Sequence, residues 1–211
     1  MIKTIVFDIG NVLFHYDPAY ILNQLLPDSP CHQQYLDHFF NAQVWQDLDK
    51  GIIAESKLAK QLAPLIPDPD LKKHIPLLIQ NFIHHLHLNN EPRQLFLRLK
   101  HTYPIYLLSN FQAVPFANLR ELHPFLYQAD GTVISAHHKL MKPDPKIYDY
   151  LLTHYFLKPD QTVFIDDLPD NISAAKQAGI HGIVFKSTDQ LITDLKALDV
   201  VVEPPQISQE L

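Results

Sequence analysis

The chain has 211 residues, of which 46% are apolar and 19% charged, a balance typical of a globular protein with a core and not of a disordered chain. Lys and Arg number 17 against 23 Asp and Glu, so the formal charge is -6, which argues against binding nucleic acid by phosphate neutralisation. No apolar run approaches the roughly 18–20 residues of a membrane span, and the N-terminus lacks a signal-peptide pattern. The single cysteine, Cys31, excludes an internal disulfide framework and a multi-cysteine zinc site. We therefore expect a soluble, cytoplasmic protein with no nucleic-acid and no membrane partner.

Five short apolar runs, rich in β-branched and aromatic residues, predict strands. They lack the polar alternation of a half-exposed sheet, which indicates strands buried on both faces. Helical patterns occupy segments between and after them, at 91–100, 115–122, 145–154 and 171–178. Alternation of this kind predicts an α/β fold with a parallel sheet and helices on both faces. The expected strands are Thr4–Phe7, Ile105–Leu108, Thr132–Ile134, Thr162–Ile165 and Gly182–Phe185.

The stretch from Pro18 to Asn89 breaks this rhythm, because it contains helical segments and no convincing strand. It is far longer than a crossover between neighbouring parallel strands requires. We expect a helical insert, or cap, over residues 16–89, with hinges near Tyr16 and Asn89. Residues 1–15 and 90–211 then form the α/β core, and the tail from Glu203 is expected to fray. The breaks within the insert fall at Pro27, Pro30, Gly51, Pro64, Pro67, Pro69 and Pro76.

Polar residues follow four of the five expected strands, and ligands of parallel sheets bind beyond the carboxyl ends of the strands. Several carboxylates gathered there would repel one another unless a cation offsets their charge, and an all-oxygen ligand set favours Mg²⁺ over zinc. A lysine and small hydrogen-bond donors beside them suit a phosphate group. The segments are Asp8-Ile9-Gly10-Asn11, Ser109-Asn110, Lys142-Pro143-Asp144-Pro145 and Asp166-Asp167-Leu168-Pro169-Asp170-Asn171.

These four segments, in this order, resemble the four motifs of the haloacid dehalogenase (HAD) superfamily. The resemblance covers essentially the whole core, and the helical insert stands where that family places its first type of cap. It implies a HAD-like, Rossmannoid five-stranded parallel sheet with strand order 3-2-1-4-5. Asp8-Ile9-Gly10-Asn11-Val12 looks most like the bacterial sugar-phosphatase group that includes α-D-glucose-1-phosphate phosphatase.

The resemblance also implies catalytic and substrate-binding roles. Asp8 would be the nucleophile that forms an aspartyl-phosphate, which water later hydrolyses. Lys142 would neutralise the phosphoryl oxygens and orient Asp8, and Ser109 would donate a hydrogen bond to them. Asn110, Asn11 and Gly10 complete the expected substrate-binding set.

The implied metal is Mg²⁺, bound by Asp8, Asp167 and the backbone carbonyl of Gly10. Asp166 stands where many relatives have glycine, so it is either a further metal ligand or a residue that positions its neighbours. Asn171 would support a metal-bound water.

Gly10 departs from the pattern of the family's phosphatases, which usually carry a second aspartate there to protonate the leaving group. The dehalogenase branch also lacks that aspartate but needs no metal, so the pair Asp166-Asp167 favours the phosphoryl branch. We predict Mg²⁺-dependent hydrolysis of a small phosphorylated metabolite, with a sugar 1-phosphate as one candidate, by a monomer or a homodimer. The alternatives are a catalytically silent HAD-like protein used for binding or regulation, and a metal-free haloacid dehalogenase.

Structural explanations compete with the functional ones at several other residues. Either Asp170 or Asn171 is expected to cap the helix that follows. Among the histidines, His15 is expected to pack at the hinge, with contact to substrate as the alternative. The remaining histidine groups and the aromatic residues of the insert are interpreted as structural: His84, His85 and His87; His137 and His138; Tyr16, Tyr20, Phe40 and Trp45.

Overall fold

The computed structural model describes residues 1–202, and the expected frayed tail from Glu203 lies outside them. Its centre is a five-stranded sheet of order β5-β4-β1-β6-β7 in which every neighbouring pair is parallel. Counted along the chain, this is the predicted order 3-2-1-4-5, and the predicted fold class is confirmed. The strands are β1 (Thr4–Phe7), β4 (Ile105–Ser109), β5 (Gly131–Ile134), β6 (Thr162–Asp166) and β7 (His181–Val184), the last beginning one residue before the expected strand.

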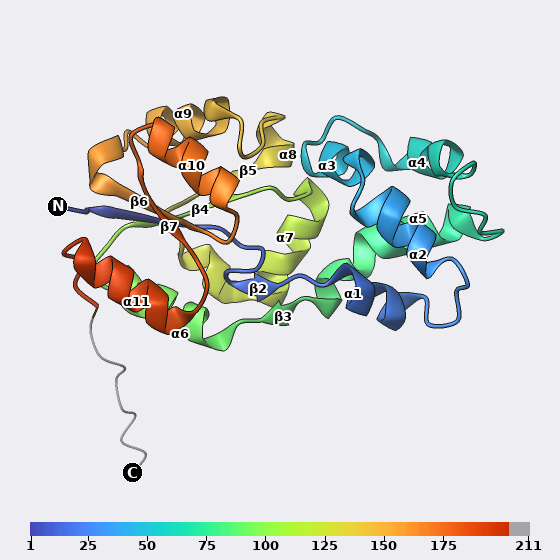
Figure 1. Ribbon diagram of the computed structural model, residues 1–211, viewed down its shortest axis with the longest axis horizontal. Coiled ribbons are helices and arrows are strands. Elements are labelled where there is room, and N and C mark those ends of the chain that lie inside the picture. Colours follow the sequence, from blue (N-terminus) through green and yellow to red (C-terminus); the bar gives the residue numbers. More distant parts are fainter. Residues whose placement is uncertain (203–211) are drawn as a thin grey trace, which may run out of the picture.

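Helices cover both faces of this sheet (Figure 1). The helices α6 (Asn90–Lys100) and α11 (Thr188–Ala197) bury their apolar stripes on the face to which Ile5 and Phe7 contribute. The helices α9 (Pro145–His154) and α10 (Pro169–Gln177) pack on the other face, with Val6 and Phe164. Because successive side chains of a strand point to opposite faces, fully apolar strands are required to supply both cores.

Strand register brings the predicted motifs to one edge of the sheet. Phe7 pairs with Leu107 on one side and with Ile165 on the other. Asp8 and Asp166 are the next residues along the chain, and Ser109 lies two residues after Leu107, so the three lie at the ends of adjacent strands, at the same edge. A central strand with a neighbour on each side places polar groups from distant parts of the sequence within reach of one another.

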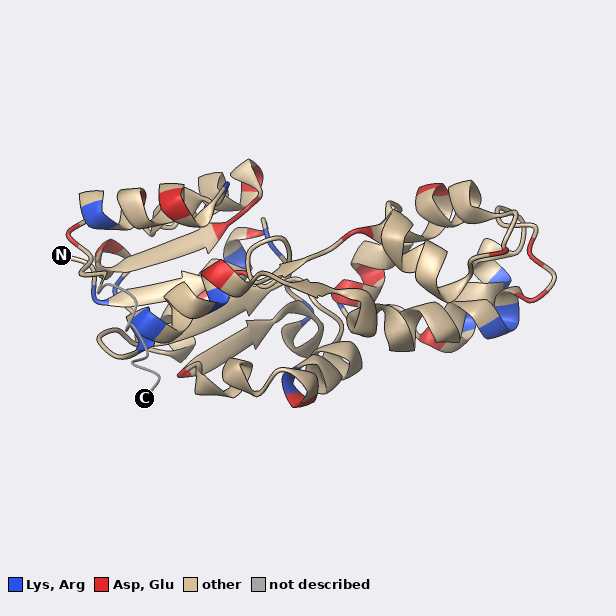
Figure 2. Ribbon diagram, turned by 90° about the horizontal axis from the view of Figure 1, so that it is seen from below, with Lys and Arg blue, Asp and Glu red and all other residues tan. Residues whose placement is uncertain are grey.

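The residues between β1 and α6 form a separate helical lobe, joined to the sheet domain by a narrow waist (Figure 2). Two short strands at the waist, β2 (Phe14–His15) and β3 (His87–Leu88), pair antiparallel. The expectation of no strand between Pro18 and Asn89 is thus wrong at β3, which is too short to show a sequence period. The lobe contains α1 (Pro18–Leu25), α2 (His32–Tyr35), η1 (Leu36–Phe40), α3 (Gln43–Asp49), α4 (Glu55–Leu62), α5 (Leu71–Asn81) and η2 (Phe82–His85).

The division of the chain at residues 16 and 89 stays a prediction, and the β2–β3 pair lies at both proposed boundaries. Between the sheet strands, the chain also forms α7 (Ala113–Leu122), η3 (Pro124–Gln128), α8 (Ser135–His138) and η4 (Pro159–Gln161). Of the helices in residues 1–202, none has both the length and the hydropathy of a membrane span.

Candidate active site

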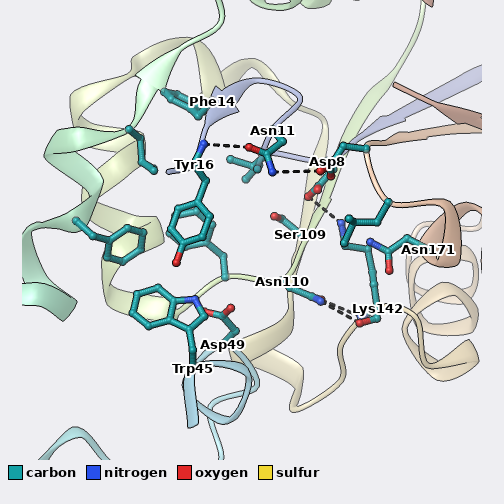
Figure 3. A pocket seen from close by; sticks show the side chains of 17 residues that line it. Asp8, Asn11, Phe14, Tyr16, Trp45, Asp49, Ser109, Asn110, Lys142 and Asn171 are labelled. Carbon is teal, nitrogen blue, oxygen red and sulfur yellow. Dashed lines mark hydrogen bonds and ion pairs between the residues drawn. The ribbon is translucent and has the colours of Figure 1, made fainter. Parts of the chain in front are cut away.

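A cavity of about 230 Å³ opens at the carboxyl ends of the central strands, between the sheet domain and the helical lobe (Figure 3). Polar residues of the predicted motifs line its inner end, and aromatic residues of the lobe and the waist line its outer part. Pockets for drug-sized ligands usually measure roughly 300–1,000 Å³, so this cavity fits a small ligand. The residues that line it are Asp8, Ile9, Gly10, Asn11, Phe14, Tyr16, Trp45, Asp49, Phe82, Leu86, Ser109, Asn110, Phe111, Lys142, Asp167, Leu168 and Asn171.

Asp8 and Lys142 form a buried ion pair at the inner end of the cavity. Lys142 Nζ lies 2.8 Å from Asp8 Oδ1 and 2.6 Å from Asp166 Oδ2, and Lys142 is 3% exposed. Burial lowers the pKa of Lys142, but Asp8 and Asp166 outweigh this and raise that pKa above its usual range. Burial raises the pKa of Asp8 to about 6, against the opposing effect of Lys142. The lysine is therefore a fixed positive charge beside a carboxylate that opens to the cavity.

Asp166 has its carboxylate occupied by protein donors. The Leu168 backbone N–H donates to it at 2.8 Å, Lys142 at 2.6 Å, and the Asn171 amide to both oxygens at 2.9 and 3.0 Å. Asp166 is fully buried and does not line the cavity. Of the two roles expected for Asp166, the geometry favours positioning of Lys142 and Asn171.

Asn171 does not cap α10, and neither does Asp170. The N-cap of that helix is Leu168, with Pro169 in the first turn. The expectation of a capping role for one of the two is therefore wrong. At the start of α10, the carboxylate of Asp166 instead accepts hydrogen bonds from the Leu168 N–H and from the Asn171 side chain.

The two asparagines expected to bind substrate are both engaged with the protein. Asn11, at φ 52°, donates to Asp167 Oδ2 at 3.1 Å and accepts from the Tyr16 N–H at 3.0 Å. Asn110 donates to the Lys142 carbonyl at 2.9 Å and accepts from the Lys142 N–H at 2.8 Å. These bonds orient Asp167 and Lys142 at the cavity, and they explain why amides occupy both positions.

The residues at the inner end fit a divalent cation. Oxygen atoms of Asp8, Asp166 and Asp167 lie within 4.8 Å of one another, and the cavity is lined by Asp8 and Asp167. Three carboxylates against one lysine leave a formal charge of -2 when all are ionised. Burial and the neighbouring Asp166 raise the pKa of Asp167, as they raise that of Asp8. A set of carboxylate ligands whose negative charge is not balanced by nearby positive charges is suited to Mg²⁺.

Gly10 and Ser109 line the cavity beside Asp8. Ser109 ends β4 and is 2% exposed. Its side chain partly opposes the rise in the pKa of Asp8 that burial causes. At Gly10, a Cβ atom would meet no heavy atom within 4 Å. Position 10 therefore has room for a Cβ atom.

The outer part of the cavity was largely missed by the sequence analysis. Tyr16 and Trp45, interpreted as core of the insert, do pack there, with ring centroids 6.2 Å apart, but both also line the cavity. Asp49, at the end of α3, was not singled out, because nothing in the local sequence distinguishes it from Asp47. Only the packing of the lobe against the sheet domain reveals its position.

None of the three histidine groups lines the cavity. His15 lies exposed on β2, where it pairs with His87, and its expected packing at a hinge stays a prediction. The rings of His137 and His138 contact Phe116 and Tyr150.

A parallel sheet with carboxylates and a lysine at its strand ends, beside an inserted helical lobe, defines a Rossmann-like α/β fold with a buried aspartate directly after its first strand. The family model for haloacid dehalogenase-like hydrolases matches residues 2–179. The chain therefore belongs to the haloacid dehalogenase-like hydrolase family, and the predicted membership is confirmed.

Among characterised proteins, the chain is similar to the sesquiterpene phosphatase astK of Aspergillus oryzae, with 27% identity over 94% of this chain and 96% of that protein. It is also 27% identical to the D-ribitol-5-phosphate phosphatase of Bacteroides thetaiotaomicron, over 86% of this chain and 90% of that one. In structure it resembles the HAD family enzyme bt-2542 of Bacteroides thetaiotaomicron, determined in complex with magnesium and inorganic phosphate. That likeness has a TM-score of 0.67 and 21% identity, and covers 88% of this chain and 95% of the other.

Proposed function

We propose that the protein is a Mg²⁺-dependent phosphatase that hydrolyses a small phosphomonoester through an aspartyl-phosphate on Asp8. The observation that carries this proposal is the buried Asp8–Lys142 pair, with Asp167 beside it, at the inner end of a small cavity. The two similar proteins named above are both phosphatases, which supports the same type of reaction here.

Asp8 performs the first chemical step. One of its carboxylate oxygens forms a bond to phosphorus, the bond between phosphorus and the leaving oxygen breaks, and the leaving group departs with that electron pair. Lys142 and Ser109 lie beside Asp8, where they hold the phosphoryl oxygens. A water then attacks phosphorus, which releases inorganic phosphate and regenerates the Asp8 carboxylate. Asp8, Asp167 and the Gly10 carbonyl would hold Mg²⁺, which would supply positive charge that offsets the phosphoryl charge.

The leaving oxygen receives no proton from position 10, because glycine has none to give. General acid catalysis typically contributes roughly 10²–10⁴-fold, so substrates with acidic leaving groups gain an advantage. A sugar 1-phosphate releases a hemiacetal hydroxyl and an acyl phosphate releases a carboxylate, and both are more acidic than an ordinary alcohol. The similarity of the Asp8–Val12 motif to the glucose-1-phosphate phosphatase group supports the first of these candidates.

The two phosphatase relatives differ in the substrates that their names state, a sesquiterpene derivative and ribitol 5-phosphate. They support the reaction and leave its substrate open. The cavity of about 230 Å³ supports a small leaving group. A monomeric or dimeric state and a cytoplasmic location stay predictions.

The proposal is tested by the release of p-nitrophenol from its phosphate ester. We expect turnover that requires Mg²⁺ and is abolished by chelator, and that a folded Asp8→Asn variant lacks, because an amide is not a competent nucleophile. A folded wild-type protein without Mg²⁺-dependent turnover on this ester or on phosphorylated metabolites would support the catalytically silent alternative. Halide release from small haloacids that chelator leaves unchanged would support the dehalogenase alternative.

A further inference from the structure

The outer end of the cavity carries a carboxyl group for which the proposed phosphatase chemistry has no use. Asp49 lies across the cavity from Asp8 and Lys142 (Figure 3). Within residues 1–202, it takes part in none of the ion pairs. Burial raises the pKa of Asp49 well above its usual range, and the neighbouring Gln112 amide opposes this only in part. The protein therefore provides a carboxyl in a ligand cavity without a positive charge to balance it.

The walls around this carboxyl are aromatic. Trp45 and Phe82 contact each other with ring centroids 5.3 Å apart, Tyr16 lies 6.2 and 6.3 Å from them, and all three line the cavity. The Tyr16 hydroxyl is buried and has no hydrogen-bond partner in the described part of the chain. Aromatic faces attract cations through the ring quadrupole, and more strongly where water is excluded.

The position of Asp49 is fixed by a close contact between the lobe and the sheet domain. The Ser135 hydroxyl at the start of α8 donates to the backbone carbonyl of Asp49. Two residues further on, Gly51 has φ +69°, and a Cβ there would lie 2.7 Å from the Ala136 carbonyl oxygen. The backbone at the end of α3 is thus held against α8 beside the cavity.

The charges of the whole cavity point to a cationic ligand group. Among the described residues that line the cavity, Lys142 is the one lysine or arginine, and Asp8 and Asp166 already pair with it. A Mg²⁺ ion and a phosphate dianion at the inner end cancel each other in charge, so they leave Asp49 without a counter-charge. A cation at the outer end would supply it and would lower the pKa of Asp49.

We propose that the leaving group of the substrate is a short apolar linker ending in an ammonium group, which Asp49 and the rings of Tyr16, Trp45 and Phe82 bind. This inference rests on the proposed function, because it places the phosphate of the same molecule at Asp8. The substrate class is the phosphate monoester of a small amino alcohol, with a primary or a quaternary nitrogen. It takes the place of the sugar 1-phosphate candidate, and its ammonium group makes the leaving alcohol more acidic than an uncharged alkyl alcohol.

A polyol phosphate fits these walls less well. Each hydroxyl of a polyol requires a hydrogen-bond partner when buried, and an unpaired one is costly. The outer wall offers the carboxyl of Asp49, the hydroxyl of Tyr16 and the indole N–H of Trp45, and its other lining residues are apolar: Phe14, Phe82, Leu86 and Phe111. A single terminal cation on a linker without hydroxyls matches this distribution.

The test compares kcat/KM for substrate pairs that differ in charge and keep their shape. Phosphocholine is paired with 3,3-dimethylbutyl phosphate, and phosphoethanolamine with propyl phosphate. We expect the wild-type protein with Mg²⁺ to prefer the charged member of at least one pair by about tenfold or more, the size of a desolvated cation contact. The pair that shows the preference distinguishes a quaternary from a primary nitrogen.

Asp49→Asn keeps the side-chain size and removes the charge, so we expect the preference to fall to about twofold or less. Asp47→Asn on the same helix removes an equal charge outside the cavity and should keep the wild-type preference. A wild-type ratio near one for both pairs, or an unchanged ratio in Asp49→Asn, would overturn the inference. Hydrolysis of p-nitrophenyl phosphate, measured in parallel, shows whether the failure is of this inference alone or of the proposed phosphatase function.

Discussion

Asp166 and Asp167 are adjacent in sequence, and the structure gives them different surroundings. Asp166 is fully buried and accepts hydrogen bonds from Lys142, Asn171 and the Leu168 N–H. Asp167 opens to the cavity and accepts from Asn11. The sequence assigned Asp167 to the metal only through the family resemblance and left two roles open for Asp166, because the turn at the end of β6 decides which carboxyl faces the ligand.

This difference predicts the Mg²⁺ dependence of two variants. Asp167→Asn removes a carboxylate from a hard-cation site, so we expect the Mg²⁺ concentration for half-maximal activity to rise by about tenfold or more. Asp166→Asn should act mainly on kcat, because it removes one of the two carboxylates that hold Lys142. A Mg²⁺ titration of phosphate release compares them. A larger shift in Asp166→Asn than in Asp167→Asn would reverse the assignment.

Gly10 provides a second prediction at the level of the residue. A Cβ there meets no heavy atom within 4 Å, so Gly10→Asp and its control Gly10→Ala should both fold. If the new carboxyl protonates the leaving oxygen, the dependence of kcat on leaving-group acidity should flatten, with gains approaching about 10²-fold for alkyl phosphates. The measurement is kcat for aryl phosphates of graded phenol acidity. Equal kcat across this series in the wild-type protein, with chemistry rate-limiting, would show that another group already supplies the proton.

Among the elements, the end of α3 has the most direct effect on the cavity. Gly51→Ala would place a methyl group 2.7 Å from the Ala136 carbonyl oxygen, so the lobe must shift away from α8. We expect kcat/KM for phosphate esters to fall at least about fivefold, since closure of a lobe over a site completes it and excludes water. Gly179→Ala is the matched control, because Gly179 also has positive φ (+82°) but lies beside Pro159, away from the lobe. Equal activity losses in the two variants would indicate strain alone.

Within the lobe, Asp68 joins α2 to α5. Tyr35 donates to its carboxylate at 2.6 Å, and His74 Nδ1 lies 2.7 Å from the same oxygen. Burial raises the pKa of Asp68, but these hydrogen bonds and that from the Asp70 N–H outweigh it and lower that pKa below its usual range. The ionised carboxylate therefore stabilises the native state above the unfolded pKa of about 3.9, and this contribution is lost as the pH falls through the lower native value.

Asp68→Asn should accordingly reduce the free energy of unfolding by about 1–2 kcal/mol at pH 7. The difference from the wild-type protein should shrink on going to pH 3. Urea unfolding at the two pH values measures it, with Asp70→Asn as the control, because Asp70 pairs only with exposed Lys73. A difference that is as large at pH 3 as at pH 7 would contradict this role of the charge.

For the whole molecule, the parts that sequence predicts are those with a local signal. The five strands are short apolar runs and could be predicted from their composition. The sheet order and the group around Asp8 and Lys142 could be predicted because the polar motifs resemble those of the HAD family. The β2–β3 pair is two residues long on each side and shows no period. The outer wall, with Trp45 and Asp49, forms where the lobe packs on the sheet domain. Helical periodicity predicts which face of a helix is apolar, but not which part of the protein that face contacts.

The central claim is that Asp8 carries the phosphoryl group. The most direct test is rapid quenching of the Mg²⁺-loaded protein during turnover of an aryl phosphate, followed by peptide mass spectrometry. We expect the peptide that contains Asp8 to gain the mass of one phosphoryl group, which is lost when the substrate is exhausted and never appears in Asp8→Asn. Sustained turnover with no phosphoryl group on Asp8, together with full activity in the Asp8→Asn variant, would contradict the account.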